Sequence, residues 1–174
     1  MTTATPARKI HHRRFGDFEV PESALLRCEG LPGFGALRHL VLVEHDCPSP
    51  FAWLVSPEDP DLAFVVADPR RFFPDYAPTL AFHHRRSIGL EEEESYDLLA
   101  IATFGGESPT LNLAAPIVVG PRTKRAVQAI LERDEYPIRA ELPRGEPALP
   151  SPAPGANAGH EPGAWDQMES KPQR

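Results

Sequence analysis

Short apolar runs separated by turn-forming residues dominate the first half of the chain. Three of them, at 37–44, 51–56 and 62–67, read LRHLVLVE, FAWLVS and LAFVVA and are rich in β-branched and aromatic residues. Such short runs are typical of β-strands, because helices need longer periodic segments. The separators HDCPSP and PEDPD contain proline and aspartate, which favour turns and end helices. The pattern therefore predicts three consecutive strands joined by turns.

Further strands are predicted on both sides of this group. Residues 10–20 place apolar side chains among charged ones, and Gly16 with Asp17 interrupts them, which indicates two short strands or one bulged strand. Residues 96–104 and 111–119 flank the loop at 105–109 (GGESP), which is typical of a β-hairpin. Pro116 places part of the second run at an edge or a bulge, because proline cannot donate to a strand ladder.

Two segments are harder to assign from their pattern. Residues 126–131 (AVQAIL) are interpreted as a strand, because the elements before them form a consecutive β series. Residues 87–95 (SIGLEEEES) are the best helix candidate, being short and acid-rich. About eight short strands at roughly ten-residue spacing predict a mainly β, single-domain fold. We expect a small β-barrel or a strongly curved antiparallel sheet, with one or two short helices.

Composition divides the chain into three parts. Residues 1–9 are polar and predicted to be flexible, and residues 10–142 form the predicted β domain. Residues 143–174 contain seven of the 21 prolines together with alanine, glycine and polar residues. Such a tail buries too little apolar area to offset its ordering entropy, so we predict that it is disordered.

The charge balance narrows the class of partner. The chain has a formal net charge of −7. Nucleic-acid affinity rests largely on neutralising phosphates, so no direct nucleic-acid binding is expected. The same charge suits a basic protein partner. Two cysteines, no apolar signal segment and no run of about 18 apolar residues predict a cytoplasmic protein without a membrane span or a disulfide framework.

Catalytic and metal-binding patterns are weak. Adjacent histidines on a strand point to opposite faces, so neither His11-His12 nor His83-His84 is expected to chelate one ion, and no metal or cofactor is predicted. The chain has no G-x-S-x-G elbow, and the Gly30–Gly35 loop lacks the lysine of a phosphate-binding loop. We therefore predict no enzyme, and a small β-barrel enzyme or ligand-binding barrel is kept as the alternative class.

Several segments, read in chain order, resemble motifs of the flagellar assembly factor FliW family. The resemblance runs from about Arg13 to Leu142. The matching segments are RFG at 14–16, GLPGF at 30–34, SPFAWL at 49–54, DPDLAFVV at 59–66, DP at 68–69, FPDY at 73–76, NLAAPIVV at 112–119, QAIL at 128–131 and YPIR at 136–139. Each motif alone is common, whereas their shared order and spacing are specific.

Two positions depart from the family pattern near the turn after Val119. The family usually has asparagine where this chain has Gly120, and glycine where it has Ala126. Both departures bear on the geometry of this turn, because a left-handed residue tolerates glycine and asparagine better than alanine.

The resemblance implies a β-barrel-like domain that binds two proteins in the cytoplasm. One is flagellin, held before its export. The other is the translational repressor CsrA, whose block on flagellin mRNA is relieved when a FliW protein binds it. The two would compete, so that the protein reports the flagellin level. A chaperone for flagellin alone is the alternative within the binding class.

The candidate contact residues come from an acidic and aromatic stretch. Glu44 to Asp75 carries seven acids against two arginines, and we interpret part of it as a docking surface for a basic partner. Three aromatic residues lie among proline and arginine at 72–76, where exposed rings would anchor a partner. The predicted protein-binding residues are Asp59, Asp61, Phe72, Phe73, Asp75, Tyr76 and Asn112. For most acids a solvated face or a turn cap is the simpler interpretation.

Overall fold

The computed structural model describes residues 6–44, 49–132 and 136–143. The predicted tail therefore lies outside the described residues, apart from Pro143, and so does most of the predicted N-terminal segment. None of the helices in the described ranges is long and apolar enough to cross a membrane.

The chain begins with a separate two-stranded sheet. β1 (Ala7–His12) and β2 (Gly16–Pro21) pair in antiparallel register, with Ile10 opposite Phe18. Gly16 has a φ of +74°, which glycine adopts without strain, so it turns the chain into β2. The two-strand interpretation of residues 10–20 is confirmed. β1 starts before residue 10, so the last residues of the predicted flexible segment belong to it.

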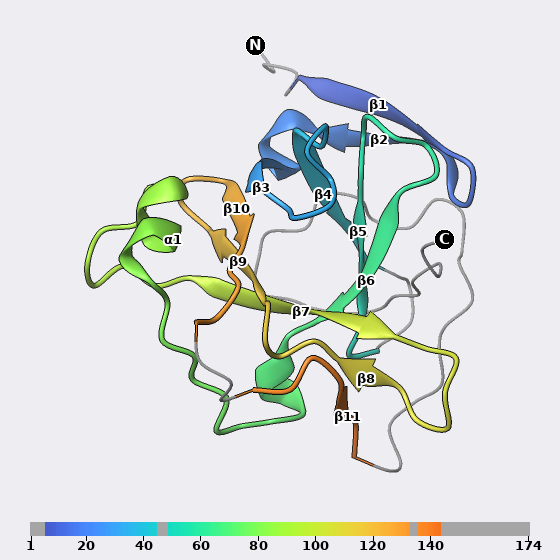
Figure 1. The fold of residues 1–174 in the computed structure, drawn as a ribbon. Coiled ribbons are helices and arrows are strands. Elements are labelled where there is room, and N and C mark those ends of the chain that lie inside the picture. The colour runs from blue at the N-terminus through green and yellow to red at the C-terminus, as the bar shows by residue number, and fades with distance from the viewer. Residues whose placement is uncertain (1–5, 45–48, 133–135, 144–174) are drawn as a thin grey trace.

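Seven strands of the second sheet close into a barrel (Figure 1). They are β3 (Leu25–Gly30), β4 (His39–Val43), β5 (Ala52–Val55), β6 (Ala63–Ala67), β7 (Asp97–Thr103), β9 (Ile117–Gly120) and β10 (Arg125–Gln128). β3 to β7 are antiparallel neighbours in chain order. The ring closes through β9, which pairs with both β7 and β10, and through the parallel pair of β10 and β3. The predicted mainly β, barrel-like fold is confirmed, with one parallel seam.

Short elements complete the barrel. They are the 3-10 turns η1 (Glu22–Ala24) and η2 (Pro69–Arg71), the helix α1 (Phe82–Ser87), and the two-residue strands β8 (Thr110–Leu111) and β11 (Ala140–Glu141). β8 pairs with β7, and β11 pairs with β8. The predicted hairpin of 96–104 with 111–119 is thus confirmed. Its second arm is split into β8 and β9, and Pro116 lies in the break.

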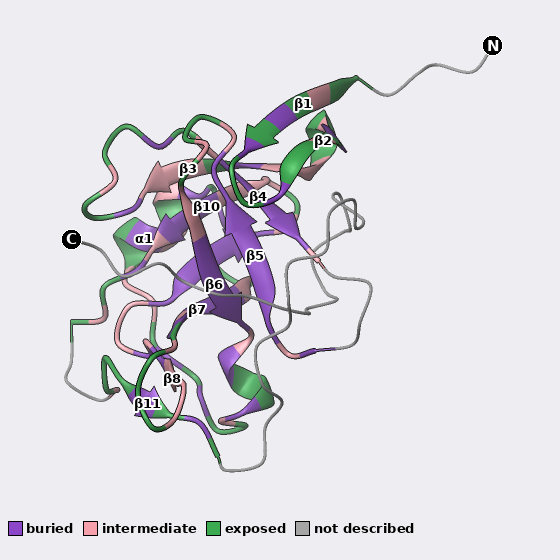
Figure 2. Ribbon diagram, turned by 90° about the vertical axis from the view of Figure 1, so that its right-hand side faces the viewer, coloured by how far each residue is buried: buried purple, intermediate pink, exposed green. Residues whose placement is uncertain are grey.

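The core reaches both faces of the central strands. All four residues of β5 are buried (Figure 2). Because successive side chains of a strand alternate, Trp53 and Leu54 point to opposite faces. A barrel alone would bury only the inward set. The second face is covered in part by the N-terminal hairpin, because the Phe15 ring lies edge-on to Trp53 at 5.0 Å between centroids. The hairpin therefore belongs to the folded unit.

The helix prediction at 87–95 is wrong in position. α1 ends at Ser87, where the predicted helix would begin. Gly89 has a φ of +69°, which breaks the helical path before the glutamates. Arg85 Nη2 then donates to the backbone carbonyls of Glu91 and Glu92 at 2.5 and 2.8 Å, which holds the acidic segment in turns.

The departures near Val119 have a simple structural basis. The left-handed residue of the β9–β10 turn is Lys124, with a φ of +51°, so neither departure occupies that conformation. A side chain at Gly120 would overlap Thr123 Oγ1. Ala126 sits in β10 opposite Val119, where an alanine is unstrained. The prediction that 126–131 is a strand is confirmed for its first three residues.

Candidate protein-binding surfaces

The turn between β5 and β6 carries two predicted binding acids, Asp59 and Asp61. Ser56 Oγ accepts hydrogen bonds from the N–H groups of Glu58 and Asp59 at 3.2 and 3.0 Å. Asp59 Oδ1 accepts the N–H of Asp61 at 2.9 Å. Such side-chain bonds satisfy groups that a tight turn leaves without backbone partners. Asp59 thus stabilises the turn while its side chain stays exposed.

Two acids of this turn, Glu58 and Asp61, form ion pairs with the N-terminal hairpin. Asp61 Oδ2 lies 2.9 Å from Arg13 Nη1, and Glu58 Oε1 lies 3.4 Å from Arg8 Nη2. Glu58 Oε1 also lies 2.7 Å from His39 Nδ1. Partial burial favours a higher pKa for Glu58, but the bonds from His39 outweigh it and lower this pKa. Much of the acidic charge here is therefore matched within the chain.

The prediction of exposed aromatic anchors at 72–76 is wrong for two of the three rings. Phe72 is buried and stacks on Phe51 at 5.6 Å between centroids. Tyr76 is 3% exposed, and its hydroxyl donates to the carbonyl of Leu113 at 2.7 Å. Burial raises the pKa of Tyr76, which keeps the phenol protonated as a donor. Phe73 is half-buried and the side chain of Asp75 is exposed, so these two remain available at the surface.

Asn112 has a local structural role. Its Oδ1 accepts the N–H of Ala115 at 3.1 Å, and its own N–H donates to the carbonyl of Ile101 at 2.9 Å. The side chain therefore forms the turn between β8 and β9, and it is half-buried.

The predicted site residues fall into two groups at opposite ends of β6. Asp59 and Asp61 precede β6, beside the N-terminal hairpin (Figure 1). The segment 72–76 follows β6 and η2 at the other end, where Tyr76 reaches the chain after β8. The predicted residues are close in sequence but do not form one patch, because the length of β6 separates the two groups.

A further acidic segment follows α1. The carboxylate of Glu94 forms two hydrogen bonds with the guanidinium of Arg122, at 2.8 and 2.9 Å. This pairing lowers the pKa of Glu94. The side chains at 91–93 are exposed. They carry acidic charge on a face separate from the β5–β6 turn.

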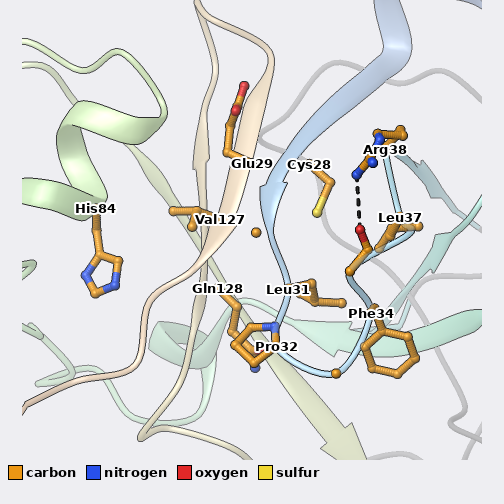
Figure 3. Close-up of a pocket in the computed structure, with 13 residues that line it drawn as sticks. Cys28, Glu29, Leu31, Pro32, Phe34, Leu37, Arg38, His84, Val127 and Gln128 are labelled. Carbon is orange, nitrogen blue, oxygen red and sulfur yellow. Dashed lines mark hydrogen bonds between the residues drawn. The ribbon is translucent and has the colours of Figure 1, made fainter.

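The Gly30–Gly35 loop forms one wall of a groove. The groove has a volume of about 500 Å³, and the end of β10 and His84 of α1 also line it (Figure 3). Gly33, with a φ of +88°, lets the loop turn, and Phe34 packs edge-on against Phe64 at 5.0 Å between centroids. The local sequence of this loop gave no sign of the groove, because the other wall, at Val127 and Gln128, lies about 100 residues away in the chain.

The histidine pairs lie in different settings. His11 is exposed and contacts Asp17, whereas His12 is buried. His83 and His84 lie on a helix instead of a strand, with their Nε2 atoms 3.1 Å apart. The strand argument against chelation therefore does not apply to this second pair. Within the described residues no group of three or more metal-binding side chains occurs.

His12 makes the stability of the fold sensitive to acid. Burial lowers its pKa below the usual 6.5, and Nδ1 accepts the N–H of Arg14 at 3.1 Å, which requires an unprotonated Nδ1. The unfolded chain therefore binds a proton more readily, so the stability contributed here is lost as pH falls below about 6.5. His12→Asn, which keeps an acceptor but does not titrate, should flatten the fall in unfolding free energy between about pH 7.5 and 5.5.

Urea titrations at both pH values test this prediction. Burial also lowers the pKa of His84 and raises that of Asp97, so each adds its own pH dependence. Only the difference between wild type and variant isolates His12. An unchanged pH slope in the variant would contradict the prediction.

Comparisons with known proteins agree with the barrel and the ordered motifs. A family model described as FliW protein matches residues 9–142. The flagellar assembly factor FliW of Syntrophotalea carbinolica is 39% identical over 138 residues, which cover 78% of this chain and 99% of that protein. FliW 2 of Desulfotalea psychrophila is 38% identical over 132 residues, which cover 75% of this chain and 87% of that protein.

A solved structure gives the same result. The crystal structure of the flagellar assembly factor FliW matches with a TM-score of 0.71 and 31% identity, covering 79% of this chain and 99% of that chain. Family model, relatives and fold thus agree over the barrel and its N-terminal hairpin. The chain belongs to the FliW family of flagellar assembly factors.

Proposed function

We propose that this protein is a non-catalytic regulator in the cytoplasm that binds two proteins, flagellin and a CsrA-type translational repressor. Flagellin is held before export. Once flagellin leaves, the protein captures the repressor and relieves the block on flagellin mRNA. Membership of the FliW family, with 39% identity to a flagellar assembly factor, is the observation that carries this proposal. We place the activity in residues 10–142.

Charge supports the repressor half of the proposal. The net charge of −7 favours a basic partner through steering and rim contacts. Asp61 and Glu58 are paired within the chain, so we assign the contact to the exposed acids Asp59 and Asp75. Because these two lie at opposite ends of β6, each is tested by itself.

Two variants test the acidic contact. Asp59→Asn keeps the acceptor for the N–H of Asp61 but removes the charge, and Asp75→Lys reverses an exposed charge. At low salt, at least one should slow association with the repressor, by about ten-fold, and added salt should shrink the difference. Glu107→Lys, at an exposed acid of the β7–β8 loop, is the matched charge control.

The outcomes separate the candidate functions. Unchanged repressor association in both variants at low salt would rule out the acidic contact. Capture of flagellin but not of the repressor by the wild-type protein would favour a chaperone for flagellin alone. Capture of neither partner would overturn the proposed function.

A further inference from the structure

Among the described residues, no strand covers the edge of the segment that follows β10. The parallel pairing of β10 with β3 ends at Val127, opposite Gly30. β3 then turns away into the Gly30–Gly35 loop, whereas the chain after β10 continues beside the segment before β9. Ala129 N–H donates to the carbonyl of Pro116 at 2.8 Å, and Leu131 N–H donates to that of Ala114 at 3.0 Å.

The backbone of the residue between them faces the other way. In an antiparallel pair, successive residues direct their N–H and C=O groups to opposite sides. The N–H and C=O groups of Ile130 therefore point away from the segment before β9. They point toward the space where β3 would lie if its pairing with β10 continued. Within the described part of the chain, neither group has a hydrogen-bond partner. Its side chain is 57% exposed.

This open edge continues the wall of the groove. Val127 and Gln128 line the groove from β10, and the glycine-rich loop lines it from the opposite side (Figure 3). A strand edge with a free donor and a free acceptor is a template for an added strand. The groove is therefore suited to an extended peptide that takes the place β3 vacates.

The charge at the groove favours an acidic peptide. Arg38 lines the groove and is exposed, and Nη1 donates only to the carbonyl of Gly35, at 3.1 Å, among the described bonds. The nearby Glu29 carboxylate is already held by Arg27 and Arg125, at 3.1 and 3.5 Å. Arg38 is thus the charge available to a ligand, and it disfavours a basic partner.

We propose that this groove binds an extended, acidic segment of unassembled flagellin, added as a strand along Ile130 with a carboxylate at Arg38. The inference rests on the proposed function, because that function names flagellin as the partner that the protein holds before assembly. A subunit kept from assembling exposes backbone that its neighbours would otherwise cover. The repressor is assigned to the acidic surfaces instead, so bound flagellin would exclude it by its bulk and not by occupying the same contact.

Proline at position 130 tests the strand addition. Ile130→Pro removes the free N–H and places a ring in its direction, whereas Ile130→Thr keeps the N–H and a β-branched side chain. Each variant is assayed with purified flagellin monomer and purified CsrA. We expect Ile130→Pro to weaken flagellin binding about ten-fold, and Ile130→Thr to keep it near the wild-type value.

The charge variants give an independent readout that needs no proline. Arg38→Glu should weaken flagellin binding about ten-fold at low salt, and Arg38→Lys should retain most of it. CsrA binding should be unchanged in all four variants. Equal flagellin binding by wild type, Ile130→Pro and Arg38→Glu would rule out the groove as the flagellin-binding site while leaving the proposed function intact. Parallel loss of both partners would also overturn it, and absence of flagellin binding by wild type would overturn both proposals.

Discussion

Replacing Trp53 by alanine should lower the unfolding free energy by about 3–5 kcal/mol, among the largest losses for a single core residue. Trp53 lies on β5 and is 1% exposed. Its ring meets the edge of Phe15, and the guanidinium of Arg14 lies 4.6 Å from the ring centroid. The truncation therefore opens a cavity in the barrel wall and removes the surface on which the N-terminal hairpin packs.

Urea denaturation followed by hydrogen exchange would check this expectation. The urea concentration at the midpoint of unfolding should fall. In hydrogen exchange, the amides of β1 and β2 should lose protection before those of β5 and β6. Trp53→Phe is the control, because it keeps a ring and removes an indole N–H that is buried without a partner among the described residues. We expect a smaller loss for it. A loss below about 1 kcal/mol for the alanine variant would show that the hairpin is not held here.

Local sequence patterns were sufficient for the strands of the barrel wall. β4, β5 and β6 fall inside the three predicted runs, because β-branched residues and the Pro-Asp separators act within a few residues of each other. The closure of the ring could not be predicted in this way. The pairing of β10 with β3 joins segments about 100 residues apart, and no local pattern encodes a parallel seam.

The prediction of the helix position was wrong for a related reason. The glutamates at 91–94 favour a helix by their own propensity, but Gly89 and the bonds from Arg85 to the carbonyls after it decide otherwise. The segment FHHRRS at 82–87 contains no acid in its first turn and no capping side chain. It therefore gave no helix signal, and His84 is the one residue of this helix that is buried.

The candidate site was predicted in its residue types more than in its arrangement. Asp59 and Asp75 are exposed, as a docking surface needs. Asp61 is exposed too, but its charge is matched by Arg13 from the turn of the N-terminal hairpin, which the sequence could not reveal. The aromatic residues at 72–76 looked exposed because proline and arginine surround them. Folding of this segment over the barrel end buries two of the three rings.

Because Tyr76 is buried, its variants can test whether this residue acts by packing in the core or by contacting a partner. Tyr76→Ala should cost about 3–5 kcal/mol, because the variant loses a buried ring that packs against Tyr136 at 4.6 Å between centroids. Tyr76→Phe keeps the ring and removes only the hydroxyl bonded to the carbonyl of Leu113. We expect a loss of about 1 kcal/mol for it, since one buried carbonyl is left unpaired.

Phe73 is the matched comparison within the same segment. Its side chain is half-buried, so Phe73→Ala should cost less than Tyr76→Ala in thermal or urea unfolding. If Tyr76 acts through the core, Tyr76→Phe should bind flagellin and CsrA like wild type wherever both are folded. A Tyr76→Ala variant with wild-type stability and lost partner binding would instead make this ring a contact residue. The buried hydroxyl bond argues against that result, because a ring bonded to Leu113 is not free to meet a partner.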